Sequence, residues 1–133
     1  MNKVVFVCLG NICRSPMAEF IMKALDQDGS LHIESRATSS WEHGNPVHQK
    51  ILRKYAVSFD SSKGSQQISQ SDFEFFDLIV GMDESNVEDL LQVSAGRYDD
   101  KIKLFRPGGV PDPWYTGDFE TTWQDITAGC NAL

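Results

Sequence analysis

The chain has 133 residues, with 12 Lys and Arg against 19 Asp and Glu, so its formal net charge is −7. This length fits a single domain with its own core, because domains cluster at about 100–150 residues, and we interpret residues 1–133 as one domain. The acidic balance argues against a nucleic-acid partner, since proteins that bind nucleic acids usually carry a basic face.

The N-terminal half alternates predicted strands with predicted helices. The run V-V-F-V at residues 4–7 is β-branched and aromatic, which predicts a strand buried on both faces. Apolar residues then recur every three or four positions, which predicts a helix over residues 16–28. A weaker strand is predicted at residues 32–36. Apolar residues at helical spacing predict a second helix at residues 47–55.

The C-terminal half continues this alternation after residues 59–71, a Ser- and Gln-rich segment that we predict to be an exposed loop. The elements predicted next are a helical turn at 72–76, a strand at 77–80, a helix that begins at 83–85, a strand at 102–105 and a final helix from 119 to 133. Such alternation predicts an α/β fold with three layers, in which helices cover both faces of a parallel sheet.

Cysteine and hydropathy patterns indicate a cytoplasmic protein. Three cysteines are too few, and odd in number, for a secreted disulfide framework. The apolar run at residues 4–9 is shorter than the roughly 18 residues of a membrane span, and polar residues follow it too soon for a signal peptide. We therefore expect no membrane partner. We also expect no metal, because the histidines show no ligand spacing: His32, His43 and His48.

The most informative segment is C-L-G-N-I-C-R-S-P at residues 8–16, which joins the first predicted strand to the first predicted helix. Backbone N–H groups at such a junction converge and form a cradle for an anion, and we expect Gly10 to let the backbone turn inward. Cys8 ends the strand, where these N–H groups favour its thiolate form. Arg14 offers a planar fork to phosphate oxygens, and the Ser15 hydroxyl can donate to the Cys8 sulfur.

A thiolate beneath a bound phosphate, with a guanidinium above it, predicts in-line attack on phosphorus. Taken singly, a cysteine at a strand end is usually a small core residue, and an arginine at a helix start is usually solvated. The joint pattern of Cys-x5-Arg-Ser with an internal glycine is much more specific. It leaves two alternatives, a phosphatase and a phosphocarrier whose Cys8 accepts phosphate without hydrolysing it.

These residues resemble the signature of the low-molecular-weight protein tyrosine phosphatases. The resemblance covers nearly the whole chain, through C-L-G-N-I-C-R-S-P followed by M-A-E, S-S-W at residues 39–41, M-D-E-S-N at 82–86 and D-P-W-Y at 112–115. It implies a four-stranded parallel sheet with strand order 2-1-3-4. It also implies hydrolysis of phosphotyrosine and other aryl phosphates through a cysteinyl-phosphate intermediate, with no metal or other cofactor.

The same resemblance implies the substrates, the ligands and the oligomeric state of the protein. Its substrates would be tyrosine-phosphorylated proteins, its other ligands inorganic phosphate or similar oxyanions, and the protein would act as a monomer. Members of the family usually run further than Leu133, which implies a shortened final helix here.

The general acid implied by the resemblance is Asp112, which lies between Pro111 and Pro113. On its own, Pro-Asp-Pro is better interpreted as a tight loop. In the family, the aspartate of this motif protonates the leaving oxygen and then takes a proton from the water that hydrolyses the thiophosphate.

Further residues of the site are expected around the phosphate cradle. The resemblance implies that the walls of the slot for a phosphorylated ring are Leu9, Ile12, Trp41, Trp114 and Tyr115, with Trp114 at a position where many members carry tyrosine. It implies supporting roles for Asn11, which would brace neighbouring backbone, and for Ser39, whose hydroxyl would lie behind the cradle. On the sequence alone, Asn11 can equally be an ordinary turn residue, and Ser39 can equally be a loop residue without a role in the site. Some relatives place a histidine near Lys63, behind the phosphate loop, and this chain has none there. We interpret Asp83 as a helix cap in preference to a contact of the active site.

Cys13 has two interpretations, a core residue or a redox partner of Cys8. In relatives with both cysteines, the second traps the oxidised nucleophile as a reversible disulfide.

Two related activities share this loop. Thioredoxin-coupled arsenate reductases need a further cysteine pair in mid-chain, and none lies between Cys13 and Cys130. Protein-arginine phosphatases tend to carry threonine where Ile12 stands, and the bulkier isoleucine favours an aryl substrate.

Overall fold

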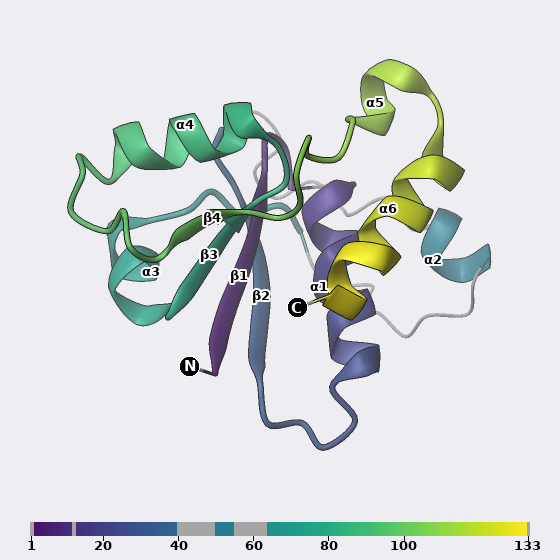
Figure 1. Cartoon of the computed structure of the whole chain (residues 1–133), viewed down its shortest axis with the longest axis horizontal. Coiled ribbons are helices and arrows are strands. Elements are labelled where there is room, and N and C mark those ends of the chain that lie inside the picture. The colour runs from purple at the N-terminus through teal and green to yellow at the C-terminus, as the bar shows by residue number, and fades with distance from the viewer. Residues whose placement is uncertain (1, 12, 40–49, 55–63, 133) are drawn as a thin grey trace.

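Four parallel strands run side by side through the middle of the molecule (Figure 1). The computed structural model describes residues 2–11, 13–39, 50–54 and 64–132. The strands are β1 (Lys3–Cys8), β2 (His32–Ala37), β3 (Leu78–Gly81) and β4 (Ile102–Leu104), and every neighbouring pair is parallel. Their spatial order is β2-β1-β3-β4, which confirms the predicted α/β class and the strand order that the family resemblance implies.

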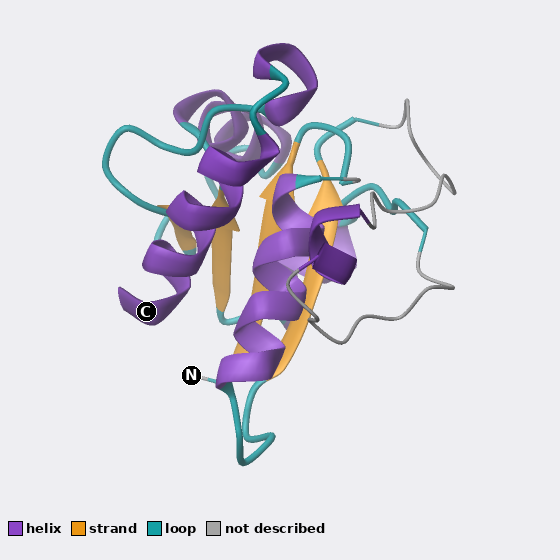
Figure 2. Cartoon of the chain, turned by 90° about the vertical axis from the view of Figure 1, so that its right-hand side faces the viewer, coloured by secondary structure: helices purple, strands orange, loops and turns teal. Residues whose placement is uncertain are grey.

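Helices cover both faces of this sheet, and Figures 1 and 2 show α1 and α6 on one side, with α3 and α4 opposite. The helices are α1 (Arg14–Leu25), α2 (Lys50–Lys54), α3 (Gln70–Phe75), α4 (Glu84–Val93), α5 (Pro113–Thr116) and α6 (Phe119–Ala132). None of the helices in the described part of the chain has the length and apolar character needed to span a bilayer.

The alternation of side chains along β1 decides where Cys8 lies. Val4, Phe6 and Cys8 pack into the core shared with α1 and α6, whereas Val5 and Val7 pack into the core shared with α3. Because β1 is central and buried on both faces, the position of its last side chain is fixed by the pleat. Cys8 therefore emerges at the carboxyl end of the sheet, on the face where α1 begins.

The segment from residue 64 to residue 71 differs from the exposed loop that its composition predicts. Ser65 and Ile68 are buried, and Gln67 forms a parallel bridge with Ala37 at the end of β2. Helix α3 already starts at Gln70, because Ser69 and Asp72 form a capping box around its first turn. The prediction of an exposed loop is wrong here because it was based on the polar side chains, whereas the backbone of this segment pairs with the edge of the sheet. Residues 59–63 of the predicted loop lie outside the described residues.

Gly129 of α6 lies against the ring of Phe105, the residue that follows β4. A Cβ atom at this position would lie 2.2 Å from the ring of Phe105, and that ring in turn packs edge-on against Phe6 with 5.9 Å between centroids. Ring and helix backbone leave no room for a methyl group, so glycine is required for packing.

We expect Gly129→Ala to lower the free energy of unfolding by about 1–3 kcal/mol through overpacking. Alanine is otherwise favoured over glycine in a helix by about 1 kcal/mol, so the sign of the change distinguishes packing from propensity. Denaturant unfolding measures it. Gln124→Ala, at an exposed position of the same helix, serves as the control. A Gly129→Ala protein as stable as the parent would contradict the packing argument.

Candidate active site

The sulfur of Cys8 lies at the carboxyl end of β1 and receives two polar contacts. The backbone N–H of Asn11 donates to Sγ at 3.2 Å, and Ser15 Oγ lies 3.1 Å from Sγ. The side chain is buried. Both contacts come from the loop and first helical turn that the sequence predicts as an anion cradle. Donors placed around a sulfur in this way stabilise a thiolate.

Asn11 holds the loop in a left-handed conformation, with φ of 55°. Asparagine is one of the residue types that tolerate a positive φ. Its side-chain amide donates to Ser15 Oγ at 2.8 Å, and its Oδ1 accepts from the Gln66 backbone N–H at 3.0 Å. The bracing role expected of Asn11 therefore matches its contacts. Since Ser15 Oγ accepts from Asn11, its own proton remains for Cys8 Sγ or for the Arg36 carbonyl at 3.3 Å.

Arg14 brings its guanidinium to the same edge of the sheet, although only 2% of the residue is exposed. Its Nη1 donates to Asp83 Oδ2 at 2.6 Å and to the Val110 carbonyl at 2.9 Å, and its Nη2 donates to Asp112 Oδ2 at 3.4 Å. Burial alone would lower the pKa of Arg14, but the charges of Cys8, Asp83 and Asp112 outweigh it and raise the pKa. The guanidinium is therefore a permanent, oriented cation.

Asp83 does more than the sequence interpretation assigns to it. Its Oδ1 accepts from the Asn86 backbone N–H at 2.8 Å, and the Asn86 side chain accepts from the Asp83 N–H at 3.2 Å, so the cap of α4 is confirmed. The choice of cap over active-site contact is nevertheless wrong, because the other carboxylate oxygen binds Arg14. One signal in the sequence points to this contact: Asp83 follows β3, and the carboxyl ends of parallel strands meet at one edge.

The loop that carries Asp112 is pressed against the start of α4. Gly109 has a φ of 71°, and a Cβ on it would lie 2.9 Å from the Asp83 Cα. This close approach brings the Val110 carbonyl and the Asp112 carboxylate to Arg14. The backbone carbonyl of Asp112 then accepts from the N–H groups of Tyr115 and Thr116, which begins α5.

The carbonyl groups of the phosphate loop are held from outside by two serines. Ser39 Oγ donates to the Leu9 carbonyl at 3.0 Å, as expected for a hydroxyl behind the cradle. Ser65 Oγ donates to the Gly10 carbonyl at 2.7 Å, a contact that the sequence analysis missed because it predicted that segment to be exposed.

The remaining predicted site residues are only partly located. Cys13 is buried at the residue preceding α1. Tyr115 lies in α5, next to the Asp112 loop, with 75% of the residue exposed. Trp114 belongs to the same short helix. Ile12, Trp41 and Lys63 lie outside the described residues. Two of the histidines, His43 and His48, lie outside them as well.

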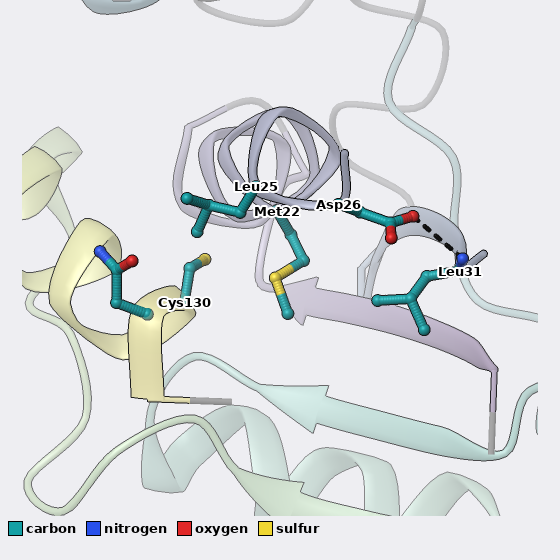
Figure 3. A pocket seen from close by; sticks show the side chains of 6 residues that line it. Met22, Leu25, Asp26, Leu31 and Cys130 are labelled. Atoms are coloured by element: carbon teal, nitrogen blue, oxygen red, sulfur yellow. Dashed lines mark hydrogen bonds between the residues drawn. The ribbon is translucent and has the colours of Figure 1, made fainter. Parts of the chain in front are cut away.

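A separate cavity of about 320 Å³ opens at the other end of α1 (Figure 3). Its lining residues come from the end of α1, the connection to β2 and the end of α6: Met22, Leu25, Asp26, Leu31, Cys130 and Asn131. Burial raises the pKa of Cys130 to about 12, so this thiol stays protonated at neutral pH. Within the described residues, no group of three or more His, Cys, Asp or Glu is arranged to hold a metal ion.

Comparison with known proteins gives a consistent result. A low molecular weight protein-tyrosine-phosphatase of Bacillus subtilis, YfkJ, is 40% identical over 100% of this chain and 94% of its own length. The crystal structure of SP-PTP, a low molecular weight protein tyrosine phosphatase from Streptococcus pyogenes, has 57% identity and a TM-score of 0.97, covering 99% of this chain and 90% of that one. The structure of a Drosophila arginine phosphatase has 30% identity and a TM-score of 0.86, covering 98% and 94%.

The family model described as low molecular weight phosphotyrosine protein phosphatase matches residues 3–133. The match spans the strand, the phosphate loop and the Asp112 loop whose geometry is given above. The chain therefore belongs to the low molecular weight phosphotyrosine protein phosphatases, metal-independent hydrolases that pass the phosphoryl group through a cysteinyl-phosphate intermediate.

Proposed function

We propose that Cys8 is the nucleophile, Arg14 the phosphate-binding cation and Asp112 the general acid in the hydrolysis of phosphotyrosine in proteins. The observation that carries the assignment is the position of Cys8 Sγ, 3.2 Å from the Asn11 N–H and 3.1 Å from Ser15 Oγ at the carboxyl end of β1. A nucleophile needs this stabilisation twice, once as the attacking thiolate and again as the leaving group.

The reaction divides into two displacements at phosphorus. In the first, Cys8 Sγ forms the S–P bond, the P–O bond to the aromatic ring breaks, and Asp112 gives its proton to the leaving oxygen. In the second, water attacks the thiophosphate, Asp112 takes the proton of that water, and Cys8 departs as a thiolate. Ser15 and the Asn11 N–H donate to the departing sulfur.

The contacts of Arg14 support different roles for its two amino groups: Nη1 orients the guanidinium, and Nη2 binds the phosphate. Nη1 is held by Asp83 and the Val110 carbonyl at 2.6 and 2.9 Å, so the guanidinium is oriented before substrate arrives. Nη2 has the longer contact, 3.4 Å to Asp112. A phosphate that takes Nη2 displaces Asp112 from it, and the displaced side chain, in its protonated form, can then donate to the leaving oxygen.

We also propose that the protein works as a monomer in the cytoplasm on tyrosine-phosphorylated proteins, with inorganic phosphate as a competing ligand. The low and odd number of cysteines, three in the whole sequence, suits a reducing compartment.

Substitution of the proposed nucleophile and acid tests these roles. We expect Cys8→Ser to abolish hydrolysis of p-nitrophenyl phosphate, because an alcohol at this position is a far poorer nucleophile than a thiolate. We expect Asp112→Asn to lower kcat by about 10²–10⁴-fold, the usual contribution of a general acid, with inhibition by inorganic phosphate largely retained. Steady-state kinetics measures both.

Two outcomes would contradict this assignment. A Cys8→Ser protein that still turns over excludes the cysteinyl-phosphate route at Cys8. An Asp112→Asn protein within about threefold of the parent kcat removes Asp112 from the mechanism.

A second substrate, phosphoarginine, is raised by one of the comparisons, the structural similarity to a Drosophila arginine phosphatase. The family resemblance argues against it, because protein-arginine phosphatases tend to carry threonine at the position of Ile12. We therefore expect kcat/KM for a phosphotyrosine peptide to exceed that for a phosphoarginine peptide of the same sequence. A higher value for phosphoarginine would reverse the assignment of substrate. Ile12→Thr in the same assay tests whether this residue determines the preference for phosphotyrosine over phosphoarginine.

Cys13 supplies a redox prediction. Peroxide converts the Cys8 thiolate to a sulfenic acid with loss of hydroxide, and attack by the Cys13 thiol then forms a disulfide and releases water. We expect peroxide inactivation to be reversed by dithiothreitol in the parent, and much less so in Cys13→Ala, where oxidation proceeds to the irreversible sulfinic acid. Mass spectrometry identifies the disulfide. Equal recovery in both proteins would exclude a protective role for Cys13.

A further inference from the structure

Ser65 lies in a segment whose backbone is tied to the sheet. The Ala37 N–H donates to the Gln66 carbonyl at 2.8 Å, and the Ile68 N–H donates to the Ala37 carbonyl, also at 2.8 Å. Only 3% of Ser65 is exposed. From this fixed position its hydroxyl donates to the Gly10 carbonyl at 2.7 Å. The contact therefore links the phosphate loop to the edge of the sheet.

The carbonyl that Ser65 holds belongs to the same peptide unit as the N–H that faces Cys8. In a trans peptide the C=O and the following N–H point in opposite directions. With the Gly10 carbonyl held outward by Ser65, the Asn11 N–H points inward to Cys8 Sγ at 3.2 Å. A rotation of this peptide would break both hydrogen bonds and turn a carbonyl oxygen toward the sulfur, where it repels a thiolate.

Asn11 needs such support, because its φ of 55° is a conformation that costs free energy for most residues. The next residue after Ser65 supplies a second tie, since the Gln66 N–H donates to Asn11 Oδ1 at 3.0 Å. Neighbouring residues thus hold the two sides of one strained turn, the Gly10 carbonyl and the Asn11 side chain.

We propose that Ser65 is a positioning residue for the reaction: its hydroxyl fixes the orientation of the Gly10–Asn11 peptide, and with it the N–H that stabilises the Cys8 thiolate. This inference rests on the proposed function, in which Cys8 is the nucleophile. The hydroxyl of Ser65 donates to the Gly10 carbonyl, so Ser65 acts on Cys8 through this peptide.

Ser65→Ala tests the proposal with three readouts. We expect kcat/KM for p-nitrophenyl phosphate to fall by on the order of tenfold, because a Gly10–Asn11 peptide without this hydrogen bond no longer keeps its N–H directed at Cys8 Sγ. We expect inorganic phosphate to inhibit correspondingly less. We also expect the pH midpoint for alkylation of Cys8 by iodoacetate, followed by peptide mass spectrometry, to move to higher pH, because the thiolate loses a donor.

Two further variants isolate the hydroxyl. Ser65→Thr keeps it and is expected to restore the alkylation midpoint and phosphate inhibition. Ser71→Ala, which removes an exposed hydroxyl six residues further on that contacts Ser69 Oγ, is expected to leave every readout unchanged. Thermal unfolding of each variant reports folding separately.

The alkylation midpoint separates failure of this inference from failure of the proposed function. If Ser65→Ala loses only thermal stability, with midpoint and phosphate inhibition unmoved, Ser65 is merely structural and the inference is overturned. Equal changes in the Ala and Thr variants would overturn it too, since the hydroxyl would then be irrelevant. If the parent itself hydrolyses no aryl phosphate, it is the proposed function that fails.

Discussion

The contacts at the carboxyl end of the sheet depend on one group, the buried guanidinium of Arg14. A cation removed from water is costly unless it is paired and hydrogen-bonded. Its partners come from separate parts of the chain, with Asp83 at the start of α4 and with Val110 and Asp112 in the loop before α5. Satisfying one charge therefore brings together the phosphate loop, α4 and the loop of the proposed acid.

The same arrangement explains how an acidic protein can bind a dianion. A net charge of −7 gives no general attraction for phosphate, so the affinity has to come from local groups. In the proposed roles, Arg14, the start of α1 and the Asn11 N–H supply it, and the burial of Cys8 and Arg14 strengthens these local interactions. The carboxylates of Asp83 and Asp112 compensate that positive charge while no phosphate is bound.

The part of the site that could be predicted from sequence is the part that is local in sequence. Residues 8–15 can be recognised from the sequence because the strand end, the loop, the proposed nucleophile and the arginine are contiguous. The α/β fold can be predicted because short apolar runs alternate with segments of helical periodicity. The contacts that were missed join distant residues: Asp83 to Arg14 across 69 positions, and Ser65 to Gly10 across 55. A serine or a capping aspartate looks the same in sequence whether or not its second contact lies in the site.

Asp83 shows why stability and function are hard to separate at this edge of the sheet. One carboxylate oxygen closes the first turn of α4 and the other orients Arg14, so a single rotamer serves both contacts. The tight packing of Gly109 against its backbone restricts Asp83 further. A capping box fixes the side chain through local hydrogen bonds, so the same hydrogen bonds that close the first turn of α4 also orient the oxygen that faces Arg14. The helix cap thus helps to orient the guanidinium of Arg14, the proposed phosphate-binding cation.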